Sequence, residues 1–471
     1  MRRISVDTLG LMSSKNGTKF EVARRRGGWI SAPRLLTTCA FFGILWLWFN
    51  VRTSEVLIPE DSFAYVQDEG LRDILNTTLG FEKILVLNLP FRTDRRDAMS
   101  LSAAISNTKL EFVEGVTGES IKNKAYPLPE ENRKLPAGIR GSWRTHMNAL
   151  QKIVDQNLTT ALILEDDVDW DIRIRQNLQR FALASRFLSS NYTSIPLSKL
   201  TSHRNTETTY TAFKIIDTSN LAKKLISLPL SSLSRQSHLT HTSSPSPYGG
   251  PSKWDILWLG HCGTGMPRPA PNQQSPNYDH AVHRTITLTY PNDSTVPSPH
   301  HLKAHPFQGD PDALATAFPP HTRIYHRATG GTLCTVGYAV SQRGARRLLH
   351  QFGVAGWNGI FDSELGRWCA GNDPDMGRQA QHSSDDAKGG GGIGVNGDER
   401  VCLTTQPPVF AHHHPSGGES DIGGVGGGFA KRYETKYLRY SVRMNLGALV
   451  GRTGGAVGAE GLVDQWPDGG E

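Results

Sequence analysis

The sequence predicts an α/β domain with a largely parallel sheet that long irregular insertions interrupt. The first observation is a strand, helix, strand alternation between Lys83 and Asp167, which is typical of parallel sheets covered by helices. The second is composition: only 37% of the 471 residues are apolar, while glycine (48) and proline (27) are plentiful. A core large enough for one domain is therefore expected, together with segments that have no regular structure.

The first predicted strand is the apolar run at 83–89, whose nearly continuous apolar character suits a strand buried on both faces. A helix is expected after it, through about Ser106, and Thr93 or Asp94 can cap that helix. A second, shorter strand is predicted at 110–116. These three elements would form the first strand, helix, strand unit of the sheet.

The turn AGIRGS at 137–142 opens a second predicted helix. One face of this helix carries an apolar stripe at helical spacing, which indicates a core-facing surface and not a cofactor site. The stripe consists of Trp143, Met147, Leu150, Ile153 and Val154. The strand at 158–164 follows and ends in the acidic residues Glu165, Asp166, Asp167 and Asp169.

The second half alternates predicted elements with irregular segments. The predicted elements are strands at 254–262, 332–341 and 401–410, a basic helix at 342–352, and histidines at 412–414 directly after the last strand. The irregular segments are a Ser/Thr/Pro-rich insertion at about 185–250 with a short helix near 219–227, a loop-like stretch at 263–317, and a Gly-rich linker at 371–398. A disordered Gly-rich tail is expected at 447–471.

The formal charge of +7 is concentrated in one flank. Residues 1–34 hold eight Lys or Arg against two acidic residues, so the remainder of the chain carries only +1. This distribution argues against a nucleic-acid-binding body. An uncharged apolar run at 35–51 follows the basic flank and is long enough for a short membrane-spanning helix. The positive-inside rule then predicts a cytosolic tail at 1–34, an anchor at 35–51, a stem at 52–80 and a luminal domain at 81–446.

A cleaved signal peptide is the competing interpretation of the apolar run, but the basic region before it is long and no small-residue cleavage site follows it. Four Asn-x-Ser/Thr triplets, at Asn76, Asn157, Asn191 and Asn292, fit a luminal body. Outside the apolar run, four cysteines could form up to two disulfides in an oxidising compartment: Cys262, Cys334, Cys369 and Cys402.

The acidic cluster is the main chemical signal. Adjacent carboxylates repel one another, so a divalent cation or a basic partner is expected beside them. A solvated turn between strand and helix is the alternative. Because side chains alternate along an extended segment, Glu165, Asp167 and Asp169 would share one face, and Asp166 would point to the other.

Taken in order, several segments resemble glycosyltransferase family 25, which includes lipooligosaccharide and procollagen galactosyltransferases. The segments are KILVLNLPFRTDRR, AGIRGSWRTHMNAL, LILEDDV, WDILWLGHC, TLCTVGYAVSQRGARRLL and FDSELGRWC. The resemblance covers about Lys83 to His414 apart from the two insertions. It implies a GT-A-like, Rossmann-type mixed sheet flanked by helices. It also implies a UDP-sugar donor and a divalent cation such as Mn²⁺.

Under this resemblance the acidic residues would hold the cation, which stabilises the charge of a diphosphate leaving group. The expected metal ligands are Asp167, Glu165, Asp169 and His412, with a surface histidine run as the alternative for His412. Asp166 would instead meet ribose or a backbone amide. A donor pocket would use Asn88, Arg92, Arg95, Arg96 and His146. The alternatives are a solvated helical turn for the arginines and a hydrogen-bonded core position for His146.

An inverting transfer needs a general base for the acceptor hydroxyl, and Asp362 and Glu364 are the candidates, unless they cap a helix that starts near Ser363. The sequence thus predicts a single-pass enzyme of the Golgi or endoplasmic reticulum membrane. It would move a sugar, galactose by resemblance, to a glycan, lipid or protein acceptor. The alternative is an inactive family member that binds glycan or protein.

Overall fold

A computed structural model describes parts of the chain from Glu69 onward. The described residues are 69–190, 216–217, 224–225, 227–234, 246–267, 286–305, 308–357, 359–371, 400–415, 421–422, 434–451 and 461–469. The predicted cytosolic tail, the anchor at 35–51, most of the stem and Asn191 lie outside these residues. Among the helices that the structure describes, none is both long and apolar enough to cross a membrane.

A large mixed sheet forms the centre of the unit, in the order β2-β1-β3-β15-β8-β16-β13-β10-β7, with β17 joining β8, β4 and β18 beside this path. Strands β2, β1 and β3 are parallel, whereas β15 runs antiparallel to both β3 and β8. The strands are β1 (Lys83–Asn88), β2 (Leu110–Glu114), β3 (Thr160–Glu165), β4 (Val168–Trp170), β7 (Ser227–Pro229), β8 (Ile256–Gly260), β10 (Thr287–Tyr290), β13 (Arg323–Arg327), β15 (Gly337–Ser341), β16 (Cys402–Gln406), β17 (Phe410–His414) and β18 (Glu434–Thr435).

Helices cover both faces of this sheet, and three smaller strand pairs lie outside it. The helices are α3 (Thr93–Ile105), α4 (Ala137–Asp155), α5 (Ile174–Ser189), α7 (Leu230–Ser234), α10 (Ala313–Ala317), α11 (Gln342–Leu349), α12 (Phe361–Ala370) and α14 (Leu446–Leu449). The short helical turns are η1 (Glu69–Leu75), η2 (Gly118–Ser120), η3 (Asn123–Ala125), η4 (Glu130–Lys134), η6 (Pro299–His301), η7 (His350–Ala355) and η8 (Arg443–Asn445). The small pairs are β5 (Ile216–Asp217) with β6 (Lys224–Leu225), β9 (Gly263–Thr264) with β14 (Thr332–Leu333), and β11 (Lys303–His305) with β12 (Gln308–Pro311).

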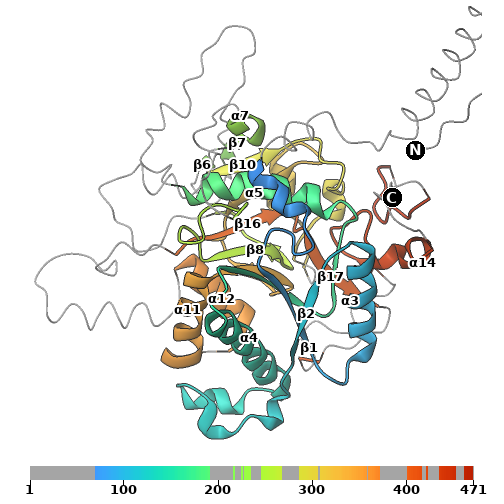
Figure 1. The fold of residues 1–471 in the computed structure, drawn as a ribbon. Coiled ribbons are helices and arrows are strands. Elements are labelled where there is room, and N and C mark those ends of the chain that lie inside the picture. Colours follow the sequence, from blue (N-terminus) through green and yellow to red (C-terminus); the bar gives the residue numbers. More distant parts are fainter. Residues whose placement is uncertain are drawn as a thin grey trace, which may run out of the picture. The chain divides into compact units, whose positions relative to one another are not determined.

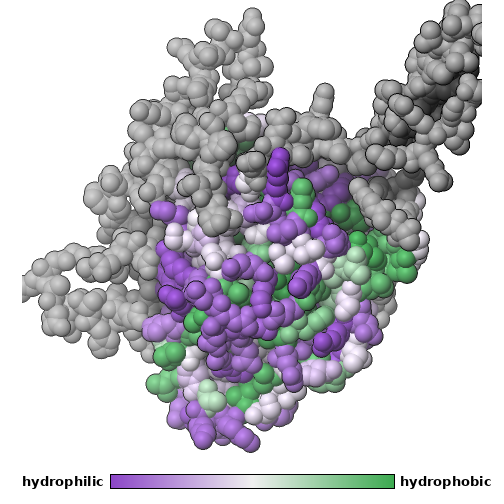
Figure 2. Space-filling view, in the orientation of Figure 1, coloured by the Kyte–Doolittle hydropathy of each residue, from purple (hydrophilic) through white to green (hydrophobic). Residues whose placement is uncertain are grey.

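Two hydrophobic clusters show how the sheet is buried. Strand β1 gives Ile84 and Val86 to one cluster and Leu85 and Leu87 to the other, because side chains alternate along a strand. Helices α3 and α5 pack on the first face, while α4, α11 and α12 pack on the second. The prediction of an α/β fold with a mixed sheet flanked by helices is therefore confirmed. In Figure 2, hydrophilic and hydrophobic residues are interspersed over the described surface in view.

Several predicted elements differ in detail. The predicted last strand at 401–410 is two strands, β16 and β17, because residues 407–409 bend between them, and the histidines at 412–414 lie within β17. The predicted strand at 332–341 is likewise split into β14 and β15. Helix α3 begins after Arg92 without a side-chain cap, since Asp94 accepts hydrogen bonds from the Arg92 guanidinium instead.

The sequence also missed elements in the segments that it described as irregular. Strand β10 belongs to the central sheet although 263–317 was expected to be loop-like, and β13 was not predicted. Near 219–227 the described residues pair as β5 and β6, not as a helix. Residues 461–469, expected in a disordered tail, hold Asp464, which pairs with Arg439. Hydrophobic periodicity cannot detect strands this short, because their pairing partners are distant in sequence.

Two disulfides form from the four predicted cysteines. One joins Cys262 to Cys334 across 72 residues, and the other joins Cys369 to Cys402. The first lies beside the β9–β14 pair. The second links α12 to β16 within the hydrophobic cluster that α4, α11 and α12 form on the second face of the sheet.

The buried histidines His261 and His326 predict acid sensitivity of the fold. Burial lowers the pKa of each from 6.5 to about 4, so the unfolded chain takes up protons first as the pH falls below 6.5. Unfolding free energy measured in urea should therefore drop between pH 7 and pH 5, by about 2 kcal/mol per histidine. His261→Gln, which keeps a donor for the Thr405 carbonyl, should reduce the total drop by about 2 kcal/mol. The exposed His300→Gln should leave it unchanged, and equal drops in both variants would contradict the assignment.

Candidate active site

The acidic residues lie where β3 ends and the chain turns into β4. Glu165 is the last residue of β3, Asp166 and Asp167 form the turn, and Asp169 lies in the middle of β4. The turn interrupts the alternation of side chains that an extended segment would have. As a result the four carboxylates point to three different environments, and they do not form a single cluster.

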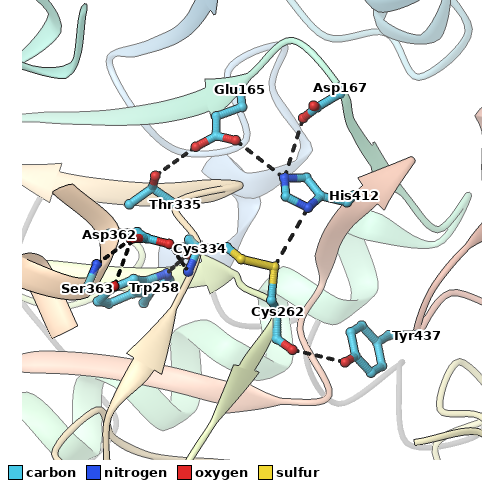
Figure 3. The surroundings of a disulfide bond; sticks show 10 residues. All are labelled: Glu165, Asp167, Trp258, Cys262, Cys334, Thr335, Asp362, Ser363, His412 and Tyr437. Carbon is cyan, nitrogen blue, oxygen red and sulfur yellow. Dashed lines mark hydrogen bonds and ion pairs between the residues drawn. A yellow bond between two sulfur atoms is a disulfide. The ribbon is translucent and has the colours of Figure 1, made fainter. Parts of the chain in front are cut away.

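Glu165, Asp167 and His412 form a group with metal-ligand geometry: one ligand atom from each lies within 4.8 Å of the others. The His412 Nε2 is 3.4 Å from the Glu165 carboxylate and 3.6 Å from that of Asp167 (Figure 3). The buried Asp167 Oδ1 accepts no hydrogen bond from the described residues. Two carboxylates and one imidazole are suitable ligands for a divalent cation such as Mn²⁺, and Asp167 Oδ1 is available to bind it.

The charges of this group depend on one another. Burial disfavours ionisation of Glu165, but hydrogen bonds from His146 and His412 lower its pKa below the ordinary value. Burial also disfavours ionisation of Asp167, but the positive charges of Arg95 and His412 outweigh it and lower the Asp167 pKa. His412 in turn has a raised pKa, because the two carboxylates outweigh its desolvation. Both carboxylates are thus held in the ionised form that a cation requires.

Asp166 points away from this group. Its carboxylate accepts hydrogen bonds from Asn88 Nδ2 at 2.8 Å and from Arg95 at 2.7 Å, and its carbonyl accepts one from Arg443 at 2.7 Å. Burial, together with the charge of Asp167, raises the pKa of Asp166. Asp166 thus points in another direction than Glu165 and Asp167, as expected. Its partners are side chains of the protein, whereas ribose or a backbone amide was expected.

Asp169, predicted as a metal ligand, does not join the group. Its side chain is fully buried and accepts hydrogen bonds from Thr435 Oγ1 at 2.8 Å, from the hydroxyl of Ser441, and from the Arg443 amide at 3.1 Å. These contacts bind β4 to the chain around β18 and η8. The physical reason is the turn at 166–167, which directs Asp169 into the protein.

A cavity of about 300 Å³ lies beyond the carboxyl ends of β1, β2 and β3, where ligands bind in open α/β sheets. It is lined by Leu87, Asn88, Leu89, Phe91, Arg95, Gly115, Val116, Thr117, Gly118, Glu119, Gly138, Gly141, Ser142, Thr145, His146, Glu165, Asp166, Asp167, Asp421 and Ile422. Glu165 and Asp167 thus connect the cavity to the metal-ligand group. Of the predicted donor-pocket residues, Asn88, Arg95, His146 and Asp166 line it.

Sequence reasoning missed the wall formed by residues 115–119 and the first turn of α4. A Cβ on Gly141 would lie 2.4 Å from the Val116 carbonyl oxygen, and one on Gly118 would lie 2.0 Å from that of Ala137. Glycine is therefore needed where the loop after β2 approaches the start of α4. The glycines of AGIRGS were the available signal, although the sequence alone assigned them only to a turn.

The predicted arginines separate. Arg95 pairs with Asp166, and with Asp167 at 3.1 Å, while Arg92 pairs with Asp94 and Asp421. Arg96 lies instead over the ring of Phe112, 4.3 Å from its centroid, so it does not share these acidic partners. Asp421 is a pocket residue that the sequence did not indicate, because it is more than 250 residues from the acidic cluster.

His146 is both a hydrogen-bonded core residue and a residue that lines the cavity, the two interpretations that the sequence left open. It is buried, its Nδ1 is 2.8 Å from the Tyr338 hydroxyl, and its ring stacks on Phe361. Its Nε2 faces the site, 3.3 Å from Thr335 Oγ1 and 3.7 Å from Glu165. His146 therefore orients Glu165 from within the core.

The two candidate bases differ in environment. Asp362 is half-buried, and its carboxylate accepts hydrogen bonds from the amides of Cys334 at 2.9 Å and Ser363 at 2.5 Å. Burial raises its pKa, and the nearby charge of Glu165 adds to this effect. Glu364 is buried and pairs with Arg367 on the same helix. Helix α12 begins at Phe361, so neither acid is its N-cap.

Arg95 balances the carboxylates of the buried Asp166 and the half-buried Asp167, so its removal should destabilise the metal-free protein. Arg95→Gln should lower the unfolding free energy by roughly 3 kcal/mol, because Asp166 and Asp167 then repel each other without the cation that pairs with both. Added Mn²⁺ should raise the melting temperature of this variant more than that of the wild type, as thermal unfolding would show. Arg96→Gln is the matched control and should behave as the wild type. Equal responses of the two variants to Mn²⁺ would contradict the role given to Arg95.

Comparison with known proteins agrees with this geometry. Residues 81–265 match the sequence profile of glycosyltransferase family 25 (LPS biosynthesis protein). Procollagen galactosyltransferase 2 of Mus musculus is 26% identical over 113 residues, which cover 22% of this chain and 18% of the relative. The human protein of the same name gives the same figures. Inactive glycosyltransferase 25 family member 3 of Homo sapiens is 29% identical over 113 residues, 22% of this chain and 19% of that protein.

The matched segments thus span about a fifth of each relative's length. The profile begins at the residue that precedes β1 by two positions, and it includes the acidic turn after β3 and the first disulfide's Cys262. The chain is thus similar to glycosyltransferase family 25 over residues 81–265, the part that holds β1 to β3, the acidic turn and much of the cavity lining.

Proposed function

We propose that this chain is a metal-dependent glycosyltransferase that moves galactose from a UDP-sugar, with inversion, to a hydroxyl group of a glycan, lipid or protein acceptor. The observation that carries the proposal is the convergence of Glu165, Asp167 and His412 at the edge of the cavity. The galactosyltransferase names of two relatives support the choice of sugar. An Mn²⁺ ion held there would act as a Lewis acid for the diphosphate leaving group.

The cavity has features that suit a nucleotide diphosphate. The first turn of α4 lines it, and the amide dipoles at a helix N-terminus favour negative groups. Arg95 also lines the cavity and adds a positive charge next to Asp166 and Asp167. Asn88 has a buried Oδ1 without a hydrogen-bond partner among the described residues, so it can accept a hydrogen bond from a base or ribose.

Asp362 is the better candidate for the general base. As the acceptor oxygen bonds to the anomeric carbon and the bond to the diphosphate breaks, the acceptor hydroxyl must lose its proton to a nearby group. The raised pKa of Asp362 makes its carboxylate a stronger proton acceptor, whereas Glu364 is already paired with Arg367. The amides of Cys334 and Ser363 hold the Asp362 carboxylate in a defined orientation.

The alternative function is a catalytically inactive binding module, since one relative is named as inactive. The described residues argue for activity because the two acids and the histidine that would bind the cation are all present and converge. Asp167 Oδ1 is buried and accepts no hydrogen bond from the described residues, which supports a cation as its partner.

We also propose that the domain works in the lumen of the Golgi or endoplasmic reticulum, anchored by residues 35–51. The two disulfides support an oxidising compartment. Glycosidase digestion of the protein from cells tests the luminal placement. Since Asn76 and Asn157 are exposed, digestion should increase electrophoretic mobility. A protein without N-glycans would argue against it.

Replacement of Asp167 tests the catalytic proposal. Asp167→Asn should lower kcat/KM for UDP-galactose on the order of 100-fold and weaken Mn²⁺ binding, because one anionic ligand is lost. The release of UDP with and without Mn²⁺ measures the first effect, and calorimetry measures the second. Asp155→Asn, an exposed acid at the end of α4, is the control and should match the wild type. A wild type that turns over no UDP-sugar with Mn²⁺ present would favour the binding module.

A further inference from the structure

The Cys262–Cys334 disulfide lies directly against the metal-ligand group. Cys262 Sγ is 3.7 Å from His412 Nδ1, on the opposite side of the imidazole from the two carboxylates (Figure 3). The ring is thus placed between sulfur and carboxylates, with one nitrogen facing each. This arrangement is separate from the second disulfide, which is buried between α12 and β16.

The same disulfide reaches the other side of the site through Cys334. The Cys334 amide donates a hydrogen bond to Asp362 at 2.9 Å, and its carbonyl accepts one from Trp258 Nε1 at 2.9 Å. The next residue, Thr335, donates to Glu165 at 2.7 Å. Cys334 has a φ of 65°, a left-handed conformation that a non-glycine residue adopts only when its surroundings hold it.

Cys262 is held just as firmly. Its amide donates to the Leu333 carbonyl at 2.9 Å, and its own carbonyl accepts a hydrogen bond from the Tyr437 hydroxyl at 3.1 Å. The β9–β14 ladder beside it has only two residue pairs, so backbone pairing alone fixes this region weakly. The covalent bond therefore supplies a constraint that the short ladder lacks.

We propose that the Cys262–Cys334 disulfide is a positioning element of the metal site, an inference that rests on the proposed function. A disulfide sulfur can only accept a hydrogen bond, so it favours the neutral tautomer of His412 that carries its proton on Nδ1 and can give Nε2 to a cation. Such an acceptor behind a ligand histidine orients the ring and selects its tautomer. Through Thr335 and the Cys334 amide, the same bond holds Glu165 and Asp362.

A free thiol at Cys262 would lack this selectivity. It can donate its hydrogen to Nδ1 and so favour the tautomer that carries hydrogen on Nε2, which cannot bind a cation. Breaking the bond would also release Cys334 from its left-handed conformation and loosen Thr335. The metal site would then form fully only where the disulfide forms, in an oxidising compartment.

The test compares the two disulfides in the full chain. Cys262→Ser with Cys334→Ser should weaken Mn²⁺ binding about tenfold or more, measured by electron paramagnetic resonance of free Mn²⁺. Cys369→Ser with Cys402→Ser should keep the Mn²⁺ affinity within about twofold while it lowers the melting temperature, since a disulfide is lost in both variants. Loss of stability alone therefore cannot produce the expected difference.

Different outcomes contradict the positioning role and the proposed function. Wild-type Mn²⁺ affinity in Cys262→Ser with Cys334→Ser, or equal weakening in both double variants, overturns the positioning role. A wild type that binds no Mn²⁺ overturns the proposed function instead. If the first double variant does not fold, Thr335→Val serves in its place, because it keeps the disulfide and removes the Thr335 hydroxyl that contacts Glu165 and His146. It should weaken Mn²⁺ binding severalfold, and an unchanged affinity would overturn the inference.

Discussion

Repulsion among the carboxylates at the end of β3 is the constraint on which the surrounding structure depends. Three acids follow one another there, and each has a different source of compensation. Arg95 and Asn88 contact Asp166, Arg95 and His412 lie beside Asp167, and Thr335, His146 and His412 surround Glu165. Because these partners come from five different elements or loops, satisfying the acids draws distant parts of the chain to one edge of the sheet.

The C-terminal segment completes this arrangement. Strand β17 brings His412 beside the acids by pairing antiparallel with β4, and η8 brings Arg443 to the Asp166 carbonyl. Asp169 then binds Thr435 and Ser441 and holds β4 to the same segment. Asp169, which the sequence predicted as a metal ligand, therefore stabilises the part of the fold that positions Asp167 and His412. The disulfide at Cys262 and Cys334 adds a covalent restraint on the opposite side of His412.

The cavity and the metal-ligand group would have different roles in the proposed glycosyl transfer. The cavity is built from the loop after β2 and the start of α4, which approach closely only because Gly118 and Gly141 have no side chains. The ligands lie at the cavity's edge, and Asp362 is held near Glu165 by the Cys334 amide. In the proposed function, donor binding, cation binding and proton removal would use neighbouring groups that the sheet presents at one edge.

The sequence by itself determined the α/β class, the strands with long apolar runs, the helices with apolar stripes and the position of the acidic turn. Local periodicity carries this information, because each element buries one face or both. Only the tertiary structure decided that Glu165 and Asp167 join His412, that Asp169 turns inward, and that Arg96 stacks on Phe112. It alone decided that β10 and β13 extend the sheet and that Asp421 reaches the cavity. These outcomes depend on backbone turns and on contacts across hundreds of residues, which no local pattern specifies.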